Sequence, residues 1–281
     1  MGLLPRRLDP GEEATLVEHL GELRTRLVYC LLALAVGTGV AFAFHRSILH
    51  WLNGPLPYVK DQATGKLVKQ QPITIDVAEP FMTSFWVSLW TGILIAMPVI
   101  LWQVWGFFAP AFEKHTQRKI AGFTVFSAFL IVAGIAFGYY VVLTPAVHFL
   151  TGYDSSQFDI QVRAKNYYAF VTLVMVAMAI VFLLPIFILA LTRIGILPVD
   201  KLRKNRRLGY VLMAALAVAL PGIDPVTTTL EMLPLMVLFE LSIWLSVFFD
   251  RRRKRREAEE ELQWQHEFGG EFAEPIELDA V

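Results

Sequence analysis

The stretch FMTSFWVSLWTGILIAMPVILWQVWGFFAPAF, residues 81–112, contains no Asp, Glu, Lys, Arg or His. A helix of about 20 apolar residues crosses the hydrocarbon core of a bilayer, so this stretch is long enough to span one. Runs without Asp, Glu, Lys or Arg also occupy residues 27–44, 120–153 and 170–192. The sequence therefore predicts an all-α protein that crosses a membrane several times.

The composition agrees with a membrane protein, because 56% of the 281 residues are hydrophobic and only 18% are charged. Soluble domains are nearer about 45–50% apolar and about 25% charged. A single cysteine, Cys30, excludes an intrachain disulfide and a metal site built from cysteines. The first apolar run exceeds the about 7–15 residues of a signal peptide, so we expect it to remain as the first span.

Six spans are predicted, and the fifth is unusually short. As a helix, residues 208–220 reach roughly 20 Å, against about 30 Å for the hydrocarbon core. The turn PGIDP, residues 221–225, joins this short span to the last one. Because the short span does not fill the bilayer, we expect the two helices to pack inside protein or the membrane to thin around them. A re-entrant hairpin with both ends on one side is the alternative. The predicted spans are residues 24–45, 80–107, 119–143, 166–191, 208–220 and 226–249.

Lys and Arg residues predict the orientation of the spans. Nineteen lie in the two termini and in the loops around residues 108–119 and 192–207, against six in the remaining loops. Cytoplasmic segments carry the excess of basic residues, so we expect both termini in the cytoplasm. We expect one transmembrane domain, residues 1–250, and a basic then acidic tail, residues 251–281, that is partly disordered.

Motifs of catalysis are missing from the sequence. The six histidines are scattered, and there is no HExxH, P-loop or GxSxG motif. We therefore expect neither an ATPase nor a metalloenzyme, and no enzyme, cofactor or nucleic-acid partner. Gly134 and Gly138 form a GxxxG pattern that predicts close helix packing, within this chain or against a partner.

The segment LVEHLGELRTRL, residues 16–27, predicts an amphipathic helix that runs into the first span. Glu18, Glu22 and Arg26 share its polar face. One interpretation is a local i,i+4 pair between Glu22 and Arg26, worth a few tenths of a kcal/mol. The other is a docking point for a cationic peptide, because a carboxylate binds guanidinium groups strongly.

Three further acids fall within or beside the last predicted span, and an acid inside a membrane normally faces protein or water. Glu240 is consistent with a functional site or with a hydrogen bond to a neighbouring helix. Glu231 lies nearer the start of the span. Asp224, in the turn, is consistent with a helix cap.

Several segments together resemble the TatC family, the multispanning receptor subunits of the twin-arginine protein translocase. The likeness covers roughly residues 15–250 in a consistent order. The segments are EHLGELRTRL (18–27), EPF (79–81), MPVILWQVWGFFAPAF (97–112), LPVDKLRKNRRLGYVL (197–212) and ALPGIDPVTTTLEMLPLMVLFE (219–240).

This resemblance implies a glove-shaped, concave bundle of six helices in the bacterial cytoplasmic (inner) membrane, as a homo-oligomer within a larger complex. It implies binding of Arg-Arg signal peptides and export of folded proteins driven by the proton-motive force. It also implies TatA- and TatB-type single-span partners.

Residues of the first helix match the family's signal-peptide contacts. Glu22 matches the family's first-helix acid and Arg24 its basic neighbour, with Glu18 nearby. A second acid usually follows a His in the loop after the second span, where this chain has Thr116. Glu113, three residues earlier, is the nearest acid and our candidate replacement.

Elsewhere the resemblance implies functional polar residues in the membrane or the outer loops. These are Glu79, Pro80, Phe81, Asp224 and Glu240. Two positions depart from the family. Leu183 stands where a polar residue is usual, which removes a contact proposed for partner docking, and Thr228 replaces a Gln. Glu231 is a candidate to restore polarity near the hairpin.

Two other functions are open to the residues alone. A proton-coupled small-molecule transporter would carry charges near the membrane midplane and often repeated halves, and no repeat is present here. A scaffold that only assembles partners would also use the GxxxG pattern and Glu240.

Overall fold

The computed structural model describes residues 16–60, 66–108, 120–158, 160–222 and 224–268. Most of them are helical, and two short strands pair antiparallel with Val59 opposite Val68. The elements are α1 (Leu16–Ala43), α2 (His45–Leu52), β1 (Tyr58–Lys60), β2 (Leu67–Lys69), α3 (Glu79–Phe108), α5 (Ile120–Phe137), the π-helical turn η2 (Gly138–Leu143), α6 (Thr144–Gly152), α7 (Ala164–Val181), α8 (Leu184–Ile194), α9 (Val199–Lys204), α10 (Arg206–Ala219) and α11 (Pro225–Phe268).

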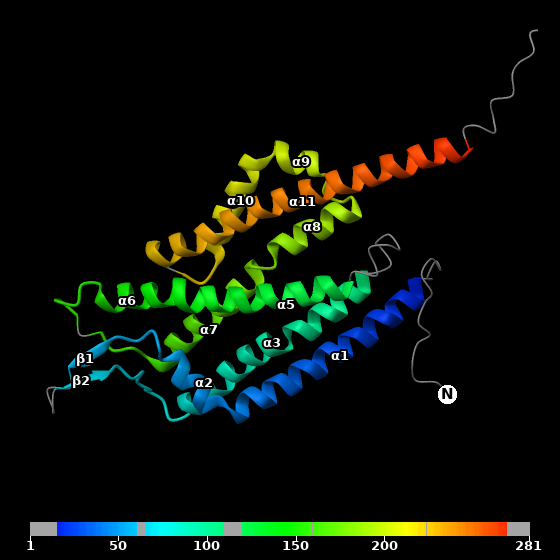
Figure 1. Cartoon of the computed structure of the whole chain (residues 1–281). Helices are drawn as coiled ribbons and strands as arrows, with labels where there is room; N and C mark the ends of the chain where they lie inside the picture. The colour runs from blue at the N-terminus through cyan, green and yellow to red at the C-terminus, as the bar shows by residue number, and fades with distance from the viewer. Residues whose placement is uncertain (1–15, 61–65, 109–119, 159, 223, 269–281) are drawn as a thin grey trace, which may run out of the picture.

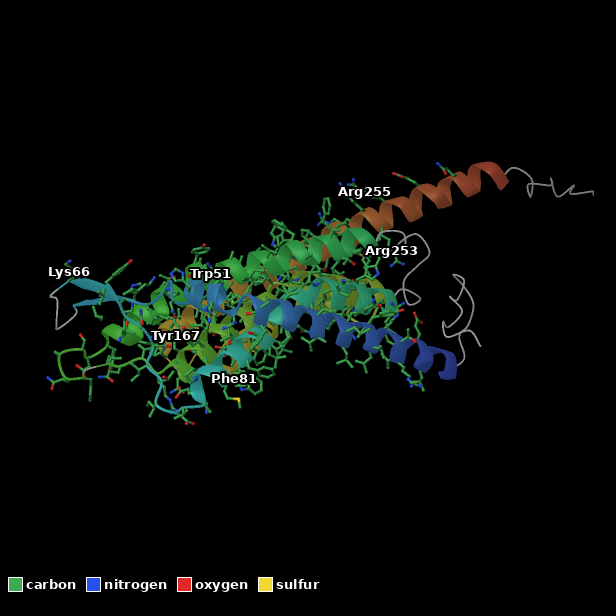
Figure 2. The ribbon with its side chains drawn as sticks, turned by 90° about the horizontal axis from the view of Figure 1, so that it is seen from below. Trp51, Lys66, Phe81, Tyr167, Arg253 and Arg255 are labelled. Atoms are coloured by element: carbon green, nitrogen blue, oxygen red, sulfur yellow. The ribbon has the colours of Figure 1, made fainter. Side chains whose placement is uncertain are left out.

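The long helices lie roughly along one direction (Figure 1). α1 packs along α3, α3 contacts α5 and α7, and α8 and α10 pack against α11. We call the end that carries β1 and β2 the hairpin end. α1 begins and α3 finishes at the opposite end, where Arg253 and Arg255 of α11 also lie, far from Lys66 (Figure 2).

Among the described residues, five helical stretches are long and apolar enough to cross a membrane. They correspond to five of the six predicted spans. The predicted fifth span, 208–220, is α10, which has only 14 residues and is therefore short, as the sequence indicated. The five stretches are Leu20–Ala43, Glu79–Phe107, Gly122–Gly152, Ala164–Ile194 and Pro225–Arg255.

Prolines act differently at their three positions within the predicted spans. The helical stretch breaks between α7 and α8, and Pro185 occupies the first turn of α8. Proline cannot donate to the carbonyl four residues earlier, here that of Val181, so α7 finishes there. Pro98 and Pro234 lie inside α3 and α11, which continue through them.

The GxxxG pattern brings α5 and η2 against α7 within this chain. A Cβ at Gly134 would lie 2.6 Å from the carbonyl oxygen of Met178, and one at Gly138 would lie 3.2 Å from the Cβ of Met178. Because these approaches leave little room for larger side chains, the two glycines fix the distance between the helices.

Tyrosines tie α2 to the bundle at the hairpin end. The hydroxyl of Tyr139 donates to the carbonyl of Trp51, and that of Tyr167 donates to the carbonyl of Leu52, both at 2.7 Å. Tyr168 donates to Oδ1 of Asn53 at 2.8 Å. The last turn of α2 is thus held by side chains from η2 and α7.

Candidate functional site

Glu22 is held by a neighbour on its own helix. Nε and Nη2 of Arg26 both donate to Oε1 of Glu22, at 2.9 and 2.5 Å. The side chains of Arg26 and Glu22 are 23% and 26% exposed. The predicted i,i+4 pair is therefore present, and it remains accessible near the start of the first candidate span.

Arg26 also connects α1 to α3, a contact that the sequence did not predict. Its Nη1 donates to Oε1 of Gln103 at 3.2 Å and to the carbonyl of Gln103 at 3.3 Å. Gly106 makes room for this guanidinium, because a Cβ there would lie 2.4 Å from Nη1. The only sign of this contact in the sequence is the glycine at position 106, one turn after Gln103, which leaves room on α3 for a side chain from another helix.

The structure describes the other predicted residues of this site to different extents. Arg24 is exposed on α1. The backbone of Glu18 belongs to α1, but its side chain lies outside the described residues, as do Glu113 and Thr116. The structure therefore brings Glu22 together with Arg26, and its relation to Glu18 and Glu113 stays a prediction.

At the hairpin end, Glu79 connects the beginnings of two membrane-crossing helices. It is 5% exposed at the start of α3. Nε and Nη2 of Arg163, the residue before α7, donate to its carboxylate at 3.0 and 3.1 Å. The backbone N–H groups of Ile75 and Lys165 donate to it as well, each at 3.1 Å. Hydrogen bonding to Glu79 and its negative charge raise the pKa of Arg163 above its ordinary value.

Pro80 and Phe81 follow Glu79 on the surface. Pro80 is the second residue of α3, where the missing N–H costs no helical hydrogen bond. The side chain of Phe81 is 61% exposed. Within the EPF segment, Glu79 makes the contacts between elements and Phe81 presents an apolar surface.

Asp224 caps α11, which agrees with the structural interpretation of this acid. Its Oδ1 accepts from the backbone N–H of Thr227 at 2.8 Å, and its Oδ2 accepts from the hydroxyl of Thr227 at 2.5 Å. Thr228 donates to the carbonyls of Gly222 and Asp224 at 3.2 and 3.0 Å. Thr228 therefore closes the turn.

Glu231 lies two turns into α11 and is fully buried. Neither of its carboxylate oxygens has a hydrogen-bond partner among the described residues. It faces the turn before α11, because its Oε2 lies 3.5 Å from the position of a Cβ at Gly222. A buried acid without a partner is destabilising.

Glu240 has two partners on α10. The hydroxyl of Tyr210 donates to Oε1 of Glu240, and Nη1 of Arg206 lies 3.5 Å from Oε2. Glu240 therefore lies level with the first turn of α10. The sequence-based alternative of a hydrogen bond to a neighbouring helix is present, and a further function stays a prediction.

Leu183 lies at the break between α7 and α8, and it packs partly buried against a cluster formed by Met97, Ile131 and Ala179. At this position the usual polar residue of the family would face an apolar neighbourhood. The local packing is consistent with the leucine found here.

Comparison with known proteins gives one result. The family model described as Sec-independent protein translocase protein (TatC) matches residues 18–234. The chain is 34% identical to the TatC protein of Deinococcus radiodurans, over 84% of this chain and 87% of the relative. It is also 34% identical to TatC of Escherichia coli K12, over 86% and 92%.

A solved structure agrees with these sequence relatives. The crystal structure of the twin-arginine translocase receptor TatC in the detergent DDM matches with a TM-score of 0.70 and 31% identity, covering 81% of this chain and 99% of that one. The chain therefore belongs to the TatC family of Sec-independent protein translocase proteins, all-α membrane proteins with several membrane-crossing helices.

Proposed function

We propose that this chain is the receptor subunit of a twin-arginine translocase and binds Arg-Arg signal peptides at the start of α1. The observation that carries the proposal is the pair of Glu22 and Arg26, partly exposed where the first candidate span begins. Arg26 already shows that a guanidinium fits this carboxylate. A peptide arginine would exchange with Arg26 or share Glu22 with it.

The geometry also supports a preference for arginine over lysine. Arg26 uses two nitrogens on Glu22 and a third on Gln103. Only a planar, forked group can make these bonds together, whereas an ammonium is a compact point charge. We propose that Arg24, Glu18 and Glu113 add to the same site.

The orientation follows from the positions of the basic residues. We propose that the hairpin end faces outward and the start of α1 faces the cytoplasm of a bacterium, with both termini on the cytoplasmic side of the inner membrane. The excess of Lys and Arg, nineteen against six, supports this. On this view residues 1–250 form one transmembrane domain with six spans, α10 included, and residues 251–281 form a cytoplasmic tail.

We further propose that the chain works in a complex with TatA- and TatB-type single-span partners and with further copies of itself, and that the proton-motive force drives export of folded proteins. Glu79, Asp224 and Glu240 would then maintain the surfaces on which partners dock. Each of them connects two elements or caps a helix. Family membership favours this function over small-molecule transport.

Crosslinking tests the proposal on the full chain in lipid nanodiscs. A photoreactive residue at each of positions 20, 21, 23 and 24, one at a time, is exposed to an Arg-Arg signal peptide and to a Lys-Lys control. We expect crosslinks to the first peptide. Glu22→Gln should weaken binding by about tenfold or more, because a partly buried charge loses its partner.

Asp250→Asn is a matched control. Asp250 also forms an i,i+4 pair, with Lys254 at 3.0 Å, and its side chain is 32% exposed. This variant should bind the peptide as the parent does. Equal affinity of the Glu22→Gln variant and the parent would reject the site.

A further inference from the structure

Two adjoining cavities open at the hairpin end between α3 and α7. The larger, about 390 Å³, reaches from the loop before α3 to the middle of the two helices, and charged residues line one part of it. The smaller, about 240 Å³, is almost entirely apolar. Trp90 and Thr172 line both cavities, so the two adjoin at these residues.

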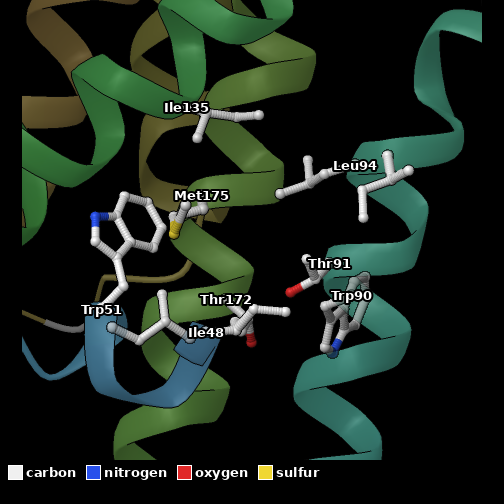
Figure 3. Close-up of a pocket in the computed structure, with 10 residues that line it drawn as sticks. Ile48, Trp51, Trp90, Thr91, Leu94, Ile135, Thr172 and Met175 are labelled. Atoms are coloured by element: carbon white, nitrogen blue, oxygen red, sulfur yellow. The ribbon is translucent and has the colours of Figure 1, made fainter. Parts of the chain in front are cut away.

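The smaller cavity is lined by residues of α2, α3, α5 and α7, most of which are labelled in Figure 3. Trp90, Thr91 and Leu94 come from α3, Met175 comes from α7, and the indole of Trp51 covers one side from α2. This side of the bundle is accessible to lipid, since Ile95 is 48% exposed.

The length of the two cavities along α3 matches one leaflet. Their α3 residues run from Glu79 to Ile95, which is roughly 24 Å of helix. One leaflet with its headgroups is about 20–22 Å thick, half of the bilayer's about 40–45 Å. The polar residues lie at the headgroup end and the apolar cavity lies toward the middle of the membrane.

The polar part of the larger cavity offers donors that suit a phosphate. Glu79 accepts from Nε and Nη2 of Arg163, and within the described residues Nη1 of Arg163 makes no hydrogen bond. Lys165 is exposed at the mouth of this cavity. Among the residues that the structure describes, its ammonium group has no ion-pair partner. Arg163 and Lys165 thus line the same cavity, beside the carboxylates of Asp76 and Glu79, and a phosphate would bind through their guanidinium and ammonium groups.

We propose that these cavities hold one phospholipid of the leaflet at the hairpin end. Its phosphate binds Arg163 and Lys165, and one acyl chain passes Trp86 and Trp90 into the smaller cavity. An acyl chain fits the smaller cavity better than a partner helix does. A helix is at least about 10 Å across, so a segment only about 3 Å long would already fill the 240 Å³ of this cavity. This inference does not depend on signal-peptide binding.

Photolabelling tests the site. The full chain is placed in nanodiscs with a trace of phosphatidylglycerol that carries a diazirine at the end of one acyl chain, and labelled peptides are mapped after irradiation. We expect labelling concentrated at Leu94, Ile95 and Met175. Diacylglycerol with the same diazirine should label these residues about tenfold less, because it lacks the phosphate.

Two pairs of variants sharpen the test. Lys165→Ala should reduce labelling about five- to tenfold, whereas Lys66→Ala, at an exposed lysine of the same end but outside the cavities, should not change it. Ala169→Trp should fill the larger cavity and reduce labelling, whereas Ala136→Trp, at an exposed alanine of α5, should not.

Four results would overturn the proposal. The first is labelling spread evenly over the lipid-facing helices, and the second is equal labelling by the two lipids. The third is equal labelling of Lys165→Ala and Lys66→Ala. The fourth is that residues of these cavities crosslink to an added single-span partner and form no lipid adduct. If Ala169→Trp does not fold, Lys165→Ala decides, because the side chain of Lys165 is exposed and an alanine is readily tolerated there.

Discussion

Glu79 and Arg163 are 84 positions apart in the sequence, yet their side chains form the ion pair that joins the start of α3 to the start of α7. The loop before α3 is tied to the same carboxylate through the N–H of Ile75. One acid therefore organises the hairpin end.

Glu79→Gln should lower the apparent melting temperature by several degrees, because a buried carboxylate that accepts from a guanidinium and from backbone N–H groups loses its charge. A thiol-reactive dye that reports exposure of Cys30, the single cysteine, measures unfolding in detergent. Glu259→Gln, the same change at an exposed acid of α11, is the control. Equal melting of the two variants would contradict the bracing role.

Tyr167→Phe should destabilise the protein by about 1 kcal/mol, since it removes a buried hydrogen bond to α2. The same dye assay measures the change. Tyr153→Phe is the matched control, because Tyr153 is 66% exposed. If both substitutions are neutral, the tyrosines do not hold α2.

Gly54→Ala should also be destabilising, because a Cβ at position 54 would lie 1.9 Å from the hydroxyl oxygen of Tyr139. In a Tyr139→Phe background this closest contact is removed, although Cζ of residue 139 stays near the added Cβ, so the alanine should cost less there than in the parent chain. A double-mutant cycle of melting temperatures measures the difference. Additive effects would show that the alanine acts elsewhere.

Arg26→Gln should raise the affinity for an Arg-Arg peptide by about twofold, because it removes a guanidinium that competes for Glu22. Glu22→Gln should have the opposite effect. Titration of a fluorescent signal peptide into nanodiscs measures both. A loss of affinity in both variants would mean that Arg26 positions Glu22 and does not compete for it.

Glu231→Leu should stabilise the protein by about 1–3 kcal/mol, because the buried carboxyl group has no hydrogen-bond partner in the described part of the chain. Thermal unfolding measures the gain, and Glu259→Leu, at an exposed acid of α11, controls for the added apolar side chain. A lower melting temperature for Glu231→Leu would reveal a partner of this acid.

The lengths of the apolar runs predicted most of the helices. The second and sixth predicted spans, 80–107 and 226–249, begin within one residue of α3 and α11, because an acid or proline marks each start. The third was predicted to finish at residue 143, before Pro145. This boundary was wrong, since η2 and α6 continue the helical stretch to Gly152. The π-helical turn accommodates the proline, which lacks an N–H.

Some contacts of the site could be predicted from the sequence and others could not. The pair of Glu22 and Arg26 follows from spacing on one helix and could be predicted. The partners Gln103, Arg163 and Tyr210 come from other elements, and their pairing depends on how the helices pack. A single sequence carries no periodic signal for such contacts, so the structure was needed to find them.

The length of α11 has a mechanical consequence. Its 44 residues make a rod of about 66 Å that extends past the rest of the bundle (Figure 1). A tilt of about 5° at the turn before Pro225 would move the exposed Gln263 by about 5 Å. The helix therefore acts as a lever arm. A small rearrangement at the turn between α10 and α11 becomes a larger displacement at its far end, where a spin label or dye would let distance spectroscopy follow it.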